Sequence, residues 1–316
     1  MEQRRSVCEL VISEFPKASV RKICKYSGLS KTSFYYPKSV EIKKSTGRPK
    51  PGYTVNRDGL IVLDSAVVEL LKKYRSEPEF ISGGGYQKLT QHLRIEHNLY
   101  INHKKIYRLC EENNILLFKQ RSFDKKKVKK RRCGYVEVTA PNQLWQFDLK
   151  YGYIHGENRW FFVLAFIDVF SKKVPNYYIG TSCKAGDLIT TLNQALINEG
   201  ITVDHKLVIR SDNGPQMSSN KFYFYLKRLE QKLSHEFIPV RTPNRNAYIE
   251  SFFSILENEL LKDRYFKTYG EAYEKVVWFI NFYNERRIHG SIKNMSPKMF
   301  IEQFNSGKIT AIQLSV

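Results

Sequence analysis

Three acidic residues stand in sequence settings that could bring their carboxylates together. Asp148 lies in LWQFDLKYGYI, a stretch rich in aromatic and branched residues that is typical of a β-strand. Asp212 follows a short apolar run in KLVIRSDNGPQ, where an Asn-Gly pair indicates a tight turn. Glu250 lies in NRNAYIESFFSILENELL, where apolar residues recur at helical spacing. Two strand-borne acids at the centre of a sheet and a helix-borne acid beside them can converge on one point.

Carboxylates gathered at one point repel one another unless cations neutralise them. Mg²⁺ or Mn²⁺ is the expected occupant, because each is held by a few carboxylates and keeps open positions for substrate phosphates. Two such ions, about 4 Å apart, stabilise the attacking and the leaving oxygen of an in-line phosphodiester displacement. The three acids therefore predict two metal ions and a phosphodiester-cutting activity.

The elements around the acids predict the fold that must position them. Three consecutive strands come first, and strands then alternate with helices, which is the order of the ribonuclease-H-like fold rather than of a doubly wound sheet. In that fold the first and fourth strands are neighbours, which would bring Asp148 beside Asp212. The expected strands are 144–154, 159–169, 173–180, 206–211 and 234–240, and the expected helices are 184–199, 219–231 and 246–261. The aromatic residues of Trp160–Phe170 are expected in the core.

Three motifs carry a resemblance to a known family. WQFDL, SDNGPQ and NAYIESFFSILE, in this order and at these separations, resemble the DDE transposases of bacterial insertion sequences, in particular insertion-sequence family three, which are related to retroviral integrases. The likeness runs from about Tyr86 to Phe300. It implies that Asp148, Asp212 and Glu250 are the metal-binding catalytic triad. The interval between the last two is slightly longer than usual, which a loop around Pro239–Pro243 would accommodate.

Two further acids are judged by this resemblance. Asp168 matches a non-catalytic acid in the second strand of the family and is therefore expected to be structural. Glu257 stands where relatives usually carry a Lys or Arg that approaches the DNA end. It has no basic residue three or four positions away, so its partner is expected elsewhere in the fold or in a second subunit. Arg245 and Lys262 are the nearby candidates for holding the DNA end.

Charge is distributed unevenly along the chain of 316 residues. The formal net charge is +21 and the sequence pI is about 9.6. Residues 1–134 hold 30 Lys and Arg against 13 Asp and Glu, whereas residues 135–316 hold 22 against 18. The first part is therefore predicted to bind a polyanion, double-stranded DNA, while the second part acts on it.

Neither a disulfide framework nor a zinc site is indicated by the cysteines, which are scattered without a CxxC pair. Free thiols suit a reducing compartment. The N-terminus lacks the apolar core of a signal peptide, and no stretch reaches the ~18 apolar residues of a membrane span. We expect a cytoplasmic protein with no membrane association. The five cysteines are Cys8, Cys24, Cys110, Cys133 and Cys183.

The chain is predicted to begin with all-α helix-turn-helix modules. Residues 1–36 form the first, with two short helices joined at Gly28 and with Ser30 as an N-cap; an ordinary helical hairpin is the alternative. Residues 37–58 read as a basic Pro- and Gly-rich linker, either solvated or lying in a minor groove. Residues 59–118 form the second module.

This second module resembles the one that precedes the catalytic core in the family. The likeness rests on GGYQKLTQHL and INHKKIYRLCEENNI, the latter capped by Asn102. It implies that the second helix of the pair faces a DNA groove, although a solvated basic face is the alternative. The DNA-binding candidates on this helix are His103, Lys104, Lys105 and Arg108.

Residues 119–134 read as a basic tether, in which 119–132 hold nine Lys or Arg in fourteen positions. Such a run either follows DNA phosphates or is a solvated connection. The candidates for phosphate contact are Lys125, Lys126, Lys127, Lys129, Lys130, Arg131 and Arg132. The catalytic core is assigned to 135–265 and a helical extension to 266–316.

The extension contains an amphipathic helix followed by YNERRIHGSIKNMSPKMF, in which Ser296 and Pro297 suit the start of a last helix. Arg286, Arg287 and His289 are expected to be exposed and to contact DNA, with local salt bridges as the alternative.

Three functions fit these observations. The leading one is a transposase that cuts DNA at the ends of an insertion sequence and transfers the freed 3′-OH to another phosphodiester. The resemblance implies homo-oligomers on paired ends, a circular intermediate, and in this group often a fusion with the product of an upstream reading frame. A ribonuclease H or junction-resolving nuclease would not need the long basic front. A non-enzymatic DNA-binding regulator would not need all three acids.

Overall fold

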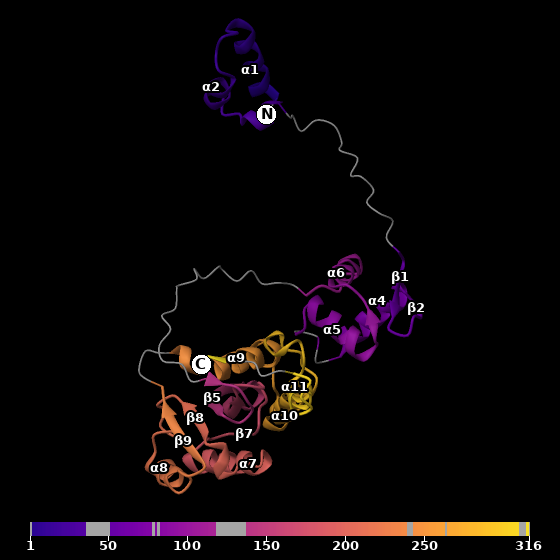
Figure 1. Cartoon of the computed structure of the whole chain (residues 1–316). Coiled ribbons are helices and arrows are strands. Elements are labelled where there is room, and N and C mark those ends of the chain that lie inside the picture. The colour runs from indigo at the N-terminus through magenta and orange to yellow at the C-terminus, as the bar shows by residue number, and fades with distance from the viewer. Residues whose placement is uncertain are drawn as a thin grey trace. The chain divides into compact units, whose positions relative to one another are not determined.

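The computed structural model describes residues 2–35, 51–77, 80, 83–117, 137–238, 243–262, 264–309 and 314–315. The chain divides into two compact units, Met1–Gly52 and Tyr53–Val316, each of which can be followed in Figure 1. Most of the predicted linker and the whole predicted tether, 119–134, lie outside the described residues. In the described part, no helix is long and apolar enough to cross a membrane.

In the described residues 2–35 of the first unit there are three helices, α1 (Glu2–Glu14), α2 (Val20–Tyr26) and α3 (Lys31–Tyr35). The turn between α2 and α3 contains Gly28, whose φ of +66° suits a residue without a Cβ. Ser30 Oγ accepts a hydrogen bond of 3.0 Å from the backbone N–H of Ser33, which caps α3. The helix pair predicted from the sequence is therefore present, and α1 is an addition to it.

The front module, residues 53–117, was predicted to be all-α, and this prediction was wrong. A three-stranded antiparallel sheet of order β2-β1-β3 accompanies its helices. The strands are β1 (Tyr53–Asn56), β2 (Ile61–Leu63) and β3 (Leu99–Tyr100), and the helices are α4 (Asp64–Ser76), α5 (Tyr86–Glu96) and α6 (His103–Glu112). Asn102 caps α6 by accepting from the backbone N–H of Lys104, as predicted.

A side chain closes the unexpected hairpin. Asn56 Oδ1 accepts hydrogen bonds from the backbone N–H groups of Asp58 and Leu60, and Gly59 adopts a φ of +83°. β1 therefore occupies residues that were predicted to be linker. The first helix of the module, α4, begins at Asp64, directly after the hairpin.

The predicted catalytic core is built on a five-stranded mixed sheet of order β7-β6-β5-β8-β9. β5 pairs antiparallel with β6 and parallel with β8, so the first and fourth strands are neighbours as predicted. This confirms the ribonuclease-H-like fold. The strands are β5 (Leu144–Ile154), β6 (Arg159–Asp168), β7 (Tyr177–Gly180), β8 (Leu207–Ser211) and β9 (Leu233–Phe237).

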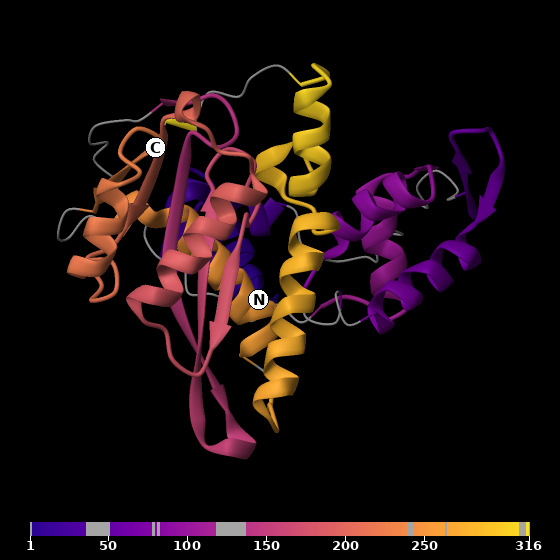
Figure 2. The same cartoon turned by 90° about the horizontal axis from the view of Figure 1, so that it is seen from below.

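Helices cover both faces of this sheet (Figure 2). On one face, Phe147 and Phe166 pack with residues of α7 (Ala185–Asn198) and α8 (Asn220–Lys227). On the other face, Val163 and Ile167 pack with residues of α9 (Ala247–Leu256) and α10 (Tyr269–Glu285). Successive side chains of a strand point to opposite faces, so β6 contributes to both clusters.

The hairpin of β5 and β6 extends beyond the rest of the sheet. β7 pairs only with Phe162–Ala165 of β6, and β8 only with Leu144–Gln146 of β5. Trp160, near the tip of the hairpin, is 57% exposed, so the prediction that it belongs to the core was wrong. The aromatic rings of Phe161 and Phe166 are fully buried, as predicted.

The helix that carries the third acid changes its geometry near its end. α9 is followed by a π-helical turn, labelled η4 (Glu257–Leu261), in place of the continuous α-helix to 261 that was predicted. α11 (Pro297–Asn305) begins as predicted, with Ser296 Oγ accepting from the N–H of Met299. β4 (Glu137–Val138) pairs with β10 (Leu314–Ser315), and short 3₁₀ turns occupy His155–Glu157, Val203–His205, Pro243–Asn246 and Gly290–Ile292.

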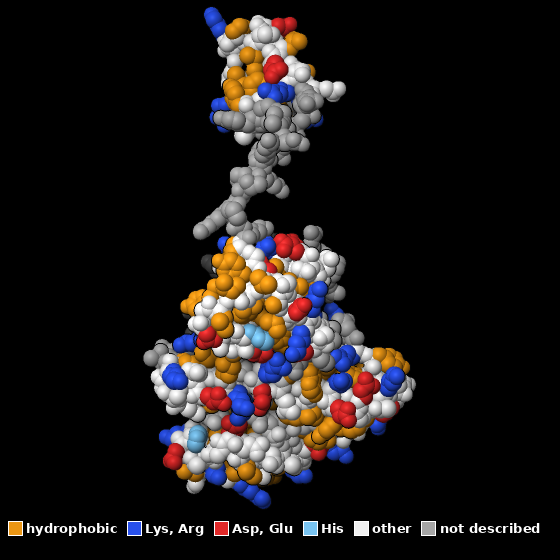
Figure 3. All heavy atoms as spheres, turned by 90° about the vertical axis from the view of Figure 1, so that its right-hand side faces the viewer, with side chains coloured by type: hydrophobic (Ala, Val, Ile, Leu, Met, Phe, Trp, Pro, Cys, Tyr) orange, Lys and Arg blue, Asp and Glu red, His pale blue; other side chains and the backbone are white. Residues whose placement is uncertain are grey.

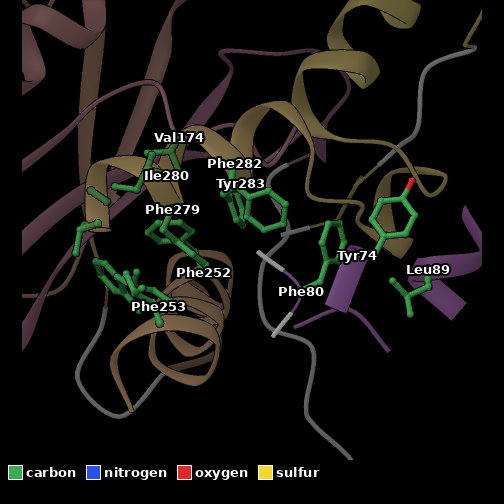
Figure 4. Packing of buried hydrophobic residues seen from close by; sticks show 14 of the residues in the cluster. Tyr74, Phe80, Leu89, Val174, Phe252, Phe253, Phe279, Ile280, Phe282 and Tyr283 are labelled. Atoms are coloured by element: carbon green, nitrogen blue, oxygen red, sulfur yellow. The ribbon is translucent and has the colours of Figure 1, made fainter. Parts of the chain in front are cut away.

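The front module and the core share one hydrophobic cluster. The rings of Phe80 and Phe282 lie 5.9 Å apart at their centroids in an edge-on arrangement, which Figure 4 shows. Around them lie Tyr74 and Leu89 of the module and Phe252 and Tyr283 of the core. The module is therefore packed onto the helices that follow the sheet.

Candidate active site

Strand pairing places the first two acids at the same level of the sheet. β5 and β8 run in parallel, with Gln146 aligned with Arg210. Asp148 stands two residues after Gln146 and is half-buried on β5. Asp212 stands two residues after Arg210 and is exposed immediately after β8. Asp148, within β5, and Asp212, just beyond the end of β8, are therefore neighbouring carboxylates near the centre of the sheet.

A buried glutamine attaches the acidic helix to this strand. Gln146 Oε1 accepts hydrogen bonds of 3.0 and 3.3 Å from the backbone N–H groups of Tyr248 and Ile249, and its Nε2 donates to the carbonyl of Arg245 at 2.7 Å. Gln146 is fully buried. It satisfies backbone groups at the start of α9, which would otherwise have no partner within the helix. The sequence analysis missed this residue, although it stands within WQFDL.

Four charged side chains line a hollow of about 390 Å³ between β5 and α9, which we call the acidic hollow. Three are acidic and one is basic. Glu257 Oε2 lies 2.9 Å from Lys150 Nζ, so the partner of Glu257 comes from elsewhere in the fold, as expected. The hollow is lined by Asp148, Leu149, Lys150, Glu250, Phe253, Ser254 and Glu257.

The electrostatics of Asp148 show that the three predicted acids act on one another. The pKa of Asp148 is raised to about 6, chiefly by burial and in addition by the negative charges of Asp212 and Glu250. The backbone N–H of Leu149 and the charge of Lys150 act in the opposite direction. The like charges are therefore close enough for each ionised neighbour to disfavour ionisation of Asp148.

The donor set fits a hard divalent cation, because it consists of carboxylate oxygens. A cation bound there would relieve the repulsion that raises the pKa of Asp148. Within the described residues, however, no group of three or more His, Cys, Asp or Glu side chains stands in an arrangement that could hold a metal. The carboxylates interact, but their side chains are not gathered into a preformed set of ligands.

Asp168 is engaged by the loop that follows β6. Its Oδ1 accepts from the backbone N–H of Asn142, and its Oδ2 accepts from the N–H and the hydroxyl of Ser171. The side chain is buried, and burial raises its pKa. These bonds fit the structural role predicted for it.

The basic residues predicted on α6 divide into two pairs. His103 and Lys104 are exposed. Lys105 Nζ lies 2.5 Å from Asp64 and also donates to the carbonyl of Tyr53, while Arg108 contacts the same Asp64 at 3.3 Å. Lys105 and Arg108 therefore already tie α6 to the first residue of α4.

The prediction of exposed basic residues in the extension was wrong for two of three. Arg287 is 6% exposed and donates two hydrogen bonds, of 2.9 and 2.6 Å, to the carboxylate of Glu259. His289 is 8% exposed and lies against the Arg287 guanidinium. Arg286 is more accessible and pairs with Glu77 and Glu96 of the front module. The sequence could not show that acids from distant segments meet these cations.

Other predicted DNA contacts are placed differently or lie outside the description. Arg245 is half-buried, and its carbonyl accepts from Gln146. On the face shown in Figure 3, basic and acidic side chains of the described residues alternate and form no large basic patch. Outside the described residues lie Pro239–Thr242 and the predicted phosphate contacts Lys125, Lys126, Lys127, Lys129, Lys130, Arg131 and Arg132.

Comparison with known proteins gives a consistent assignment. Two family models, both described as an integrase core domain, match residues 138–243 and 231–297, and these intervals contain all three acids. A 39.2 kDa protein of insertion element IS476 from Xanthomonas euvesicatoria is 25% identical over 96% of this chain and 78% of its own length. The transposase of insertion sequence IS904 from Lactococcus lactis is 29% identical over 54% of this chain and 65% of its own.

This chain belongs to the DDE transposases of insertion sequences. The transposase is thus an enzyme of the polynucleotidyl transferase type. Membership of the integrase-core family fits dependence on a divalent metal, binding to DNA and assembly in more than one copy. Among solved structures, the catalytic core domain of the HTLV-2 integrase in complex with magnesium covers 51% of this chain and 96% of that chain at 19% identity, with a TM-score of 0.38.

Proposed function

We propose that the transposase cuts DNA at the ends of its insertion sequence and joins the freed end to a new phosphodiester. In the first step water attacks phosphorus, the bond from phosphorus to the 3′ oxygen breaks, and that oxygen leaves as a 3′-OH. In the second step this 3′-OH attacks another phosphodiester, so that one such bond forms as one breaks. The observation that carries the proposal is the placement of Asp148 beside Asp212 on adjacent parallel strands, with Glu250 lining the same hollow as Asp148.

Asp148, Asp212 and Glu250 are the proposed ligands of two Mg²⁺ or Mn²⁺ ions. When bound, the ions would favour formation of the attacking oxyanion and stabilise the leaving oxygen. Asp148 and Asp212 would supply oxygens from adjacent parallel strands, and Glu250 would supply them from the helix. The hydrogen bonds of Gln146 to the start of α9 support the position of Glu250 relative to β5.

The remainder of the chain is proposed to bring double-stranded DNA to this site. We propose that the helices within 1–36 and 59–118 bind DNA and that 119–134 follows its phosphates, because the first 134 residues hold 30 Lys and Arg against 13 Asp and Glu. Residues 135–265 would carry out the chemistry, and 266–316 would support the acidic helix. Work as a homo-oligomer on paired ends, and fusion with an upstream frame product, belong to the same proposal.

Substitution of each acid tests the chemistry separately from DNA binding. The substrate is a plasmid carrying the DNA that flanks the gene, incubated with the full chain in Mg²⁺, Mn²⁺ or Ca²⁺. Asp148→Asn, Asp212→Asn and Glu250→Gln should each abolish cleavage and leave DNA binding almost unchanged. Glu230→Gln, a change at an exposed acid three residues beyond the end of α8, is the matched control and should cut normally.

The choice of metal ion and of nucleic-acid substrate provides the results that would contradict the proposal. Mg²⁺ or Mn²⁺ should support cleavage, whereas Ca²⁺ should support binding only. Cleavage by Asp212→Asn in Mg²⁺ would remove that acid from the proposed site. Cutting of RNA–DNA hybrids or junctions in preference to the flanking DNA would favour a nuclease of the same fold over transposition.

A further inference from the structure

The acidic hollow contains one cation whose role the proposed chemistry does not explain. Lys150 stands on β5 two residues after Asp148, and its side chain reaches across to Glu257 at the start of the π-helical turn. Both side chains line the same hollow as Asp148 and Glu250. The ion pair therefore spans the hollow beside the acids that are proposed to carry out the reaction.

The backbones of Lys150 and Glu257 lie in different kinds of secondary structure. Lys150 pairs with Val163 in the register of β5 and β6, so its backbone is fixed in the sheet. Glu257 begins a π-helical turn. This geometry is rare in proteins as a whole, but where it occurs it is often at a functional site. The cation thus belongs to the rigid framework, and its carboxylate partner belongs to the irregular end of the helix.

The ion pair between Lys150 and Glu257 also contributes little to stability, so little free energy is lost when it breaks. The side chains of Lys150 and Glu257 retain 31% and 37% of their exposure, so water and salt screen their attraction. Pairs of this kind contribute at most about 1 kcal/mol. A DNA phosphate carries the same negative charge as a carboxylate and offers oxygens at a similar reach from Lys Nζ.

We propose that Lys150 binds a backbone phosphate of DNA at the acidic hollow, and that Glu257 occupies this position until the DNA arrives. Binding then exchanges one anionic partner of Lys150 for another, and releases Glu257 toward solvent. The exchange rests on the proposed function, since it assumes that a DNA strand enters the hollow. It makes Lys150 a substrate-binding residue and Glu257 a competitor of the phosphate.

Two other roles of the Lys150–Glu257 pair predict different measurements. The pair could only stabilise the fold, or Glu257 could only repel DNA at long range. If the pair only fastens the end of α9 to β5, removal of either partner should lower stability and weaken DNA binding alike. If Glu257 merely repels DNA at long range, its neutralisation should help whether or not Lys150 is present. Only the exchange requires that the effect of Glu257 pass through Lys150.

A double-mutant cycle on the full chain tests this. Binding of a fluorescent duplex of random sequence is measured by anisotropy in Ca²⁺, with Glu257→Gln, Lys150→Gln and the double variant. We expect Glu257→Gln to bind up to about fivefold more tightly and Lys150→Gln up to about fivefold more weakly, the ratio that corresponds to about 1 kcal/mol. The double variant should match Lys150→Gln within about twofold. Glu274→Gln, at an exposed position of α10, controls for the loss of one negative charge.

Two results would overturn the exchange. One is tighter binding by the double variant than by Lys150→Gln, in the same ratio as Glu257→Gln over the parent. The other is weaker or unchanged binding by Glu257→Gln together with a lowered unfolding midpoint. Because anisotropy does not depend on cleavage, failure here leaves the assignment of the three acids untouched. Conversely, cleavage by Asp148→Asn would refute the chemistry without altering the cycle.

Discussion

Gln146 shows how a single uncharged side chain can position a proposed catalytic acid. Replacement by Leu would leave the backbone N–H groups of Tyr248 and Ile249 without their partner, and the carbonyl of Arg245 would keep only its 3.4 Å hydrogen bond from Arg210. Each buried group left unsatisfied costs about 1–3 kcal/mol. We expect Gln146→Leu to lower the free energy of unfolding by about 3 kcal/mol or more in a urea titration, and cleavage to fall even in molecules that remain folded.

A conservative variant separates these two effects. Gln146→Glu keeps the oxygens that accept from Tyr248 and Ile249, but it loses the donor to Arg245 and adds a charge near Asp148. It should retain more stability than Gln146→Leu while losing cleavage. Normal cleavage by Gln146→Leu at a temperature where it is folded would show that this attachment does not position Glu250.

His289 predicts a pH dependence of stability. Burial lowers its pKa to about 2, helped by the nearby charges of Arg287, Lys88 and Lys172, while Tyr283 packs edge-on against the ring. An unfolded His binds its proton near pH 6.5. The unfolded state therefore takes up a proton that the folded state refuses, so this stabilisation is complete above pH 6.5 and declines as the pH falls.

The measurement compares unfolding of the parent and of His289→Gln between pH 7.5 and pH 5, without divalent metal. Between pH 7.5 and pH 5, protonation of His289 in the unfolded state should lower the free energy of unfolding of the parent by about 2 kcal/mol. His289→Gln should not show this decrease. The raised pKa of Asp148 has the opposite sign, but it is common to both proteins and cancels in the difference. Equal pH dependence of the two proteins would contradict the prediction.

Residue types were easier to predict than residue partners. The three acids were found because each stands at a recognisable place in a strand or a helix. The burial of Arg287 and His289 could not be found, because it depends on Glu259 and Lys88 arriving from other parts of the chain. Gln146 was overlooked because a polar residue within a strand is ordinarily assigned to a solvated face.

At the scale of elements, the π-helical turn connects the acidic helix to the front module. Glu259 within this turn receives two hydrogen bonds from Arg287 and lies 3.9 Å from Lys88 of α5. A Cβ at Gly83 would lie 2.9 Å from the carboxylate carbon of Glu259, so the module backbone approaches this side chain closely. The turn thus packs simultaneously against the extension and the module.

Removal of Arg287 should destabilise this junction. The Glu259 side chain is only 14% exposed, and loss of one partner from a buried pair typically costs about 3–5 kcal/mol. We expect Arg287→Met to lower the free energy of unfolding by about 3 kcal/mol in urea. Adding Glu259→Gln should recover part of the loss, because the buried charge is then removed as well. A double variant less stable than Arg287→Met would contradict the importance of the charge.

The core strands followed from the sequence because apolar strands separated by turns leave little freedom in their order. The hairpin of β1 and β2 did not, because Pro and Gly nearby indicated a linker, and its closure depends on the side chain of Asn56. The change from α9 to a π-helical turn was also missed. Regular apolar spacing cannot show that Glu259 is drawn toward Arg287.

At the scale of the whole molecule, the charge distribution was read correctly from the sequence alone, whereas its surface pattern was not. The net charge of +21 is concentrated in the first 134 residues. Yet several cations of the described residues are engaged by acids, including Lys105 by Asp64 and Arg286 by Glu77. Formal charge therefore overstates the number of side chains that are ready to meet DNA phosphates.

This imbalance is the reason why we propose that the basic run at 119–132 contributes to DNA binding. It holds nine Lys or Arg in fourteen positions, with only Asp124 as an acid. Affinity that rests on phosphate contacts falls with salt, and each lost contact reduces the slope of log K against log salt by about 0.9. Neutralising Lys125, Lys126, Lys127, Lys129, Lys130, Arg131 and Arg132 should therefore weaken binding to all DNA sequences alike and flatten the slope.

The number of contacts can be read from the size of that change. A flattening of about 6 would mean that all seven positions meet phosphates, and smaller values count proportionately fewer. Neutralising Lys221, Lys227 and Arg228, which are exposed on and beside α8, provides a control for the loss of net charge outside the run. If that control flattened the slope as much per charge as the variant in the run, general attraction would account for both. An unchanged slope in the seven-fold variant would mean that the run connects the front module to the core without touching DNA.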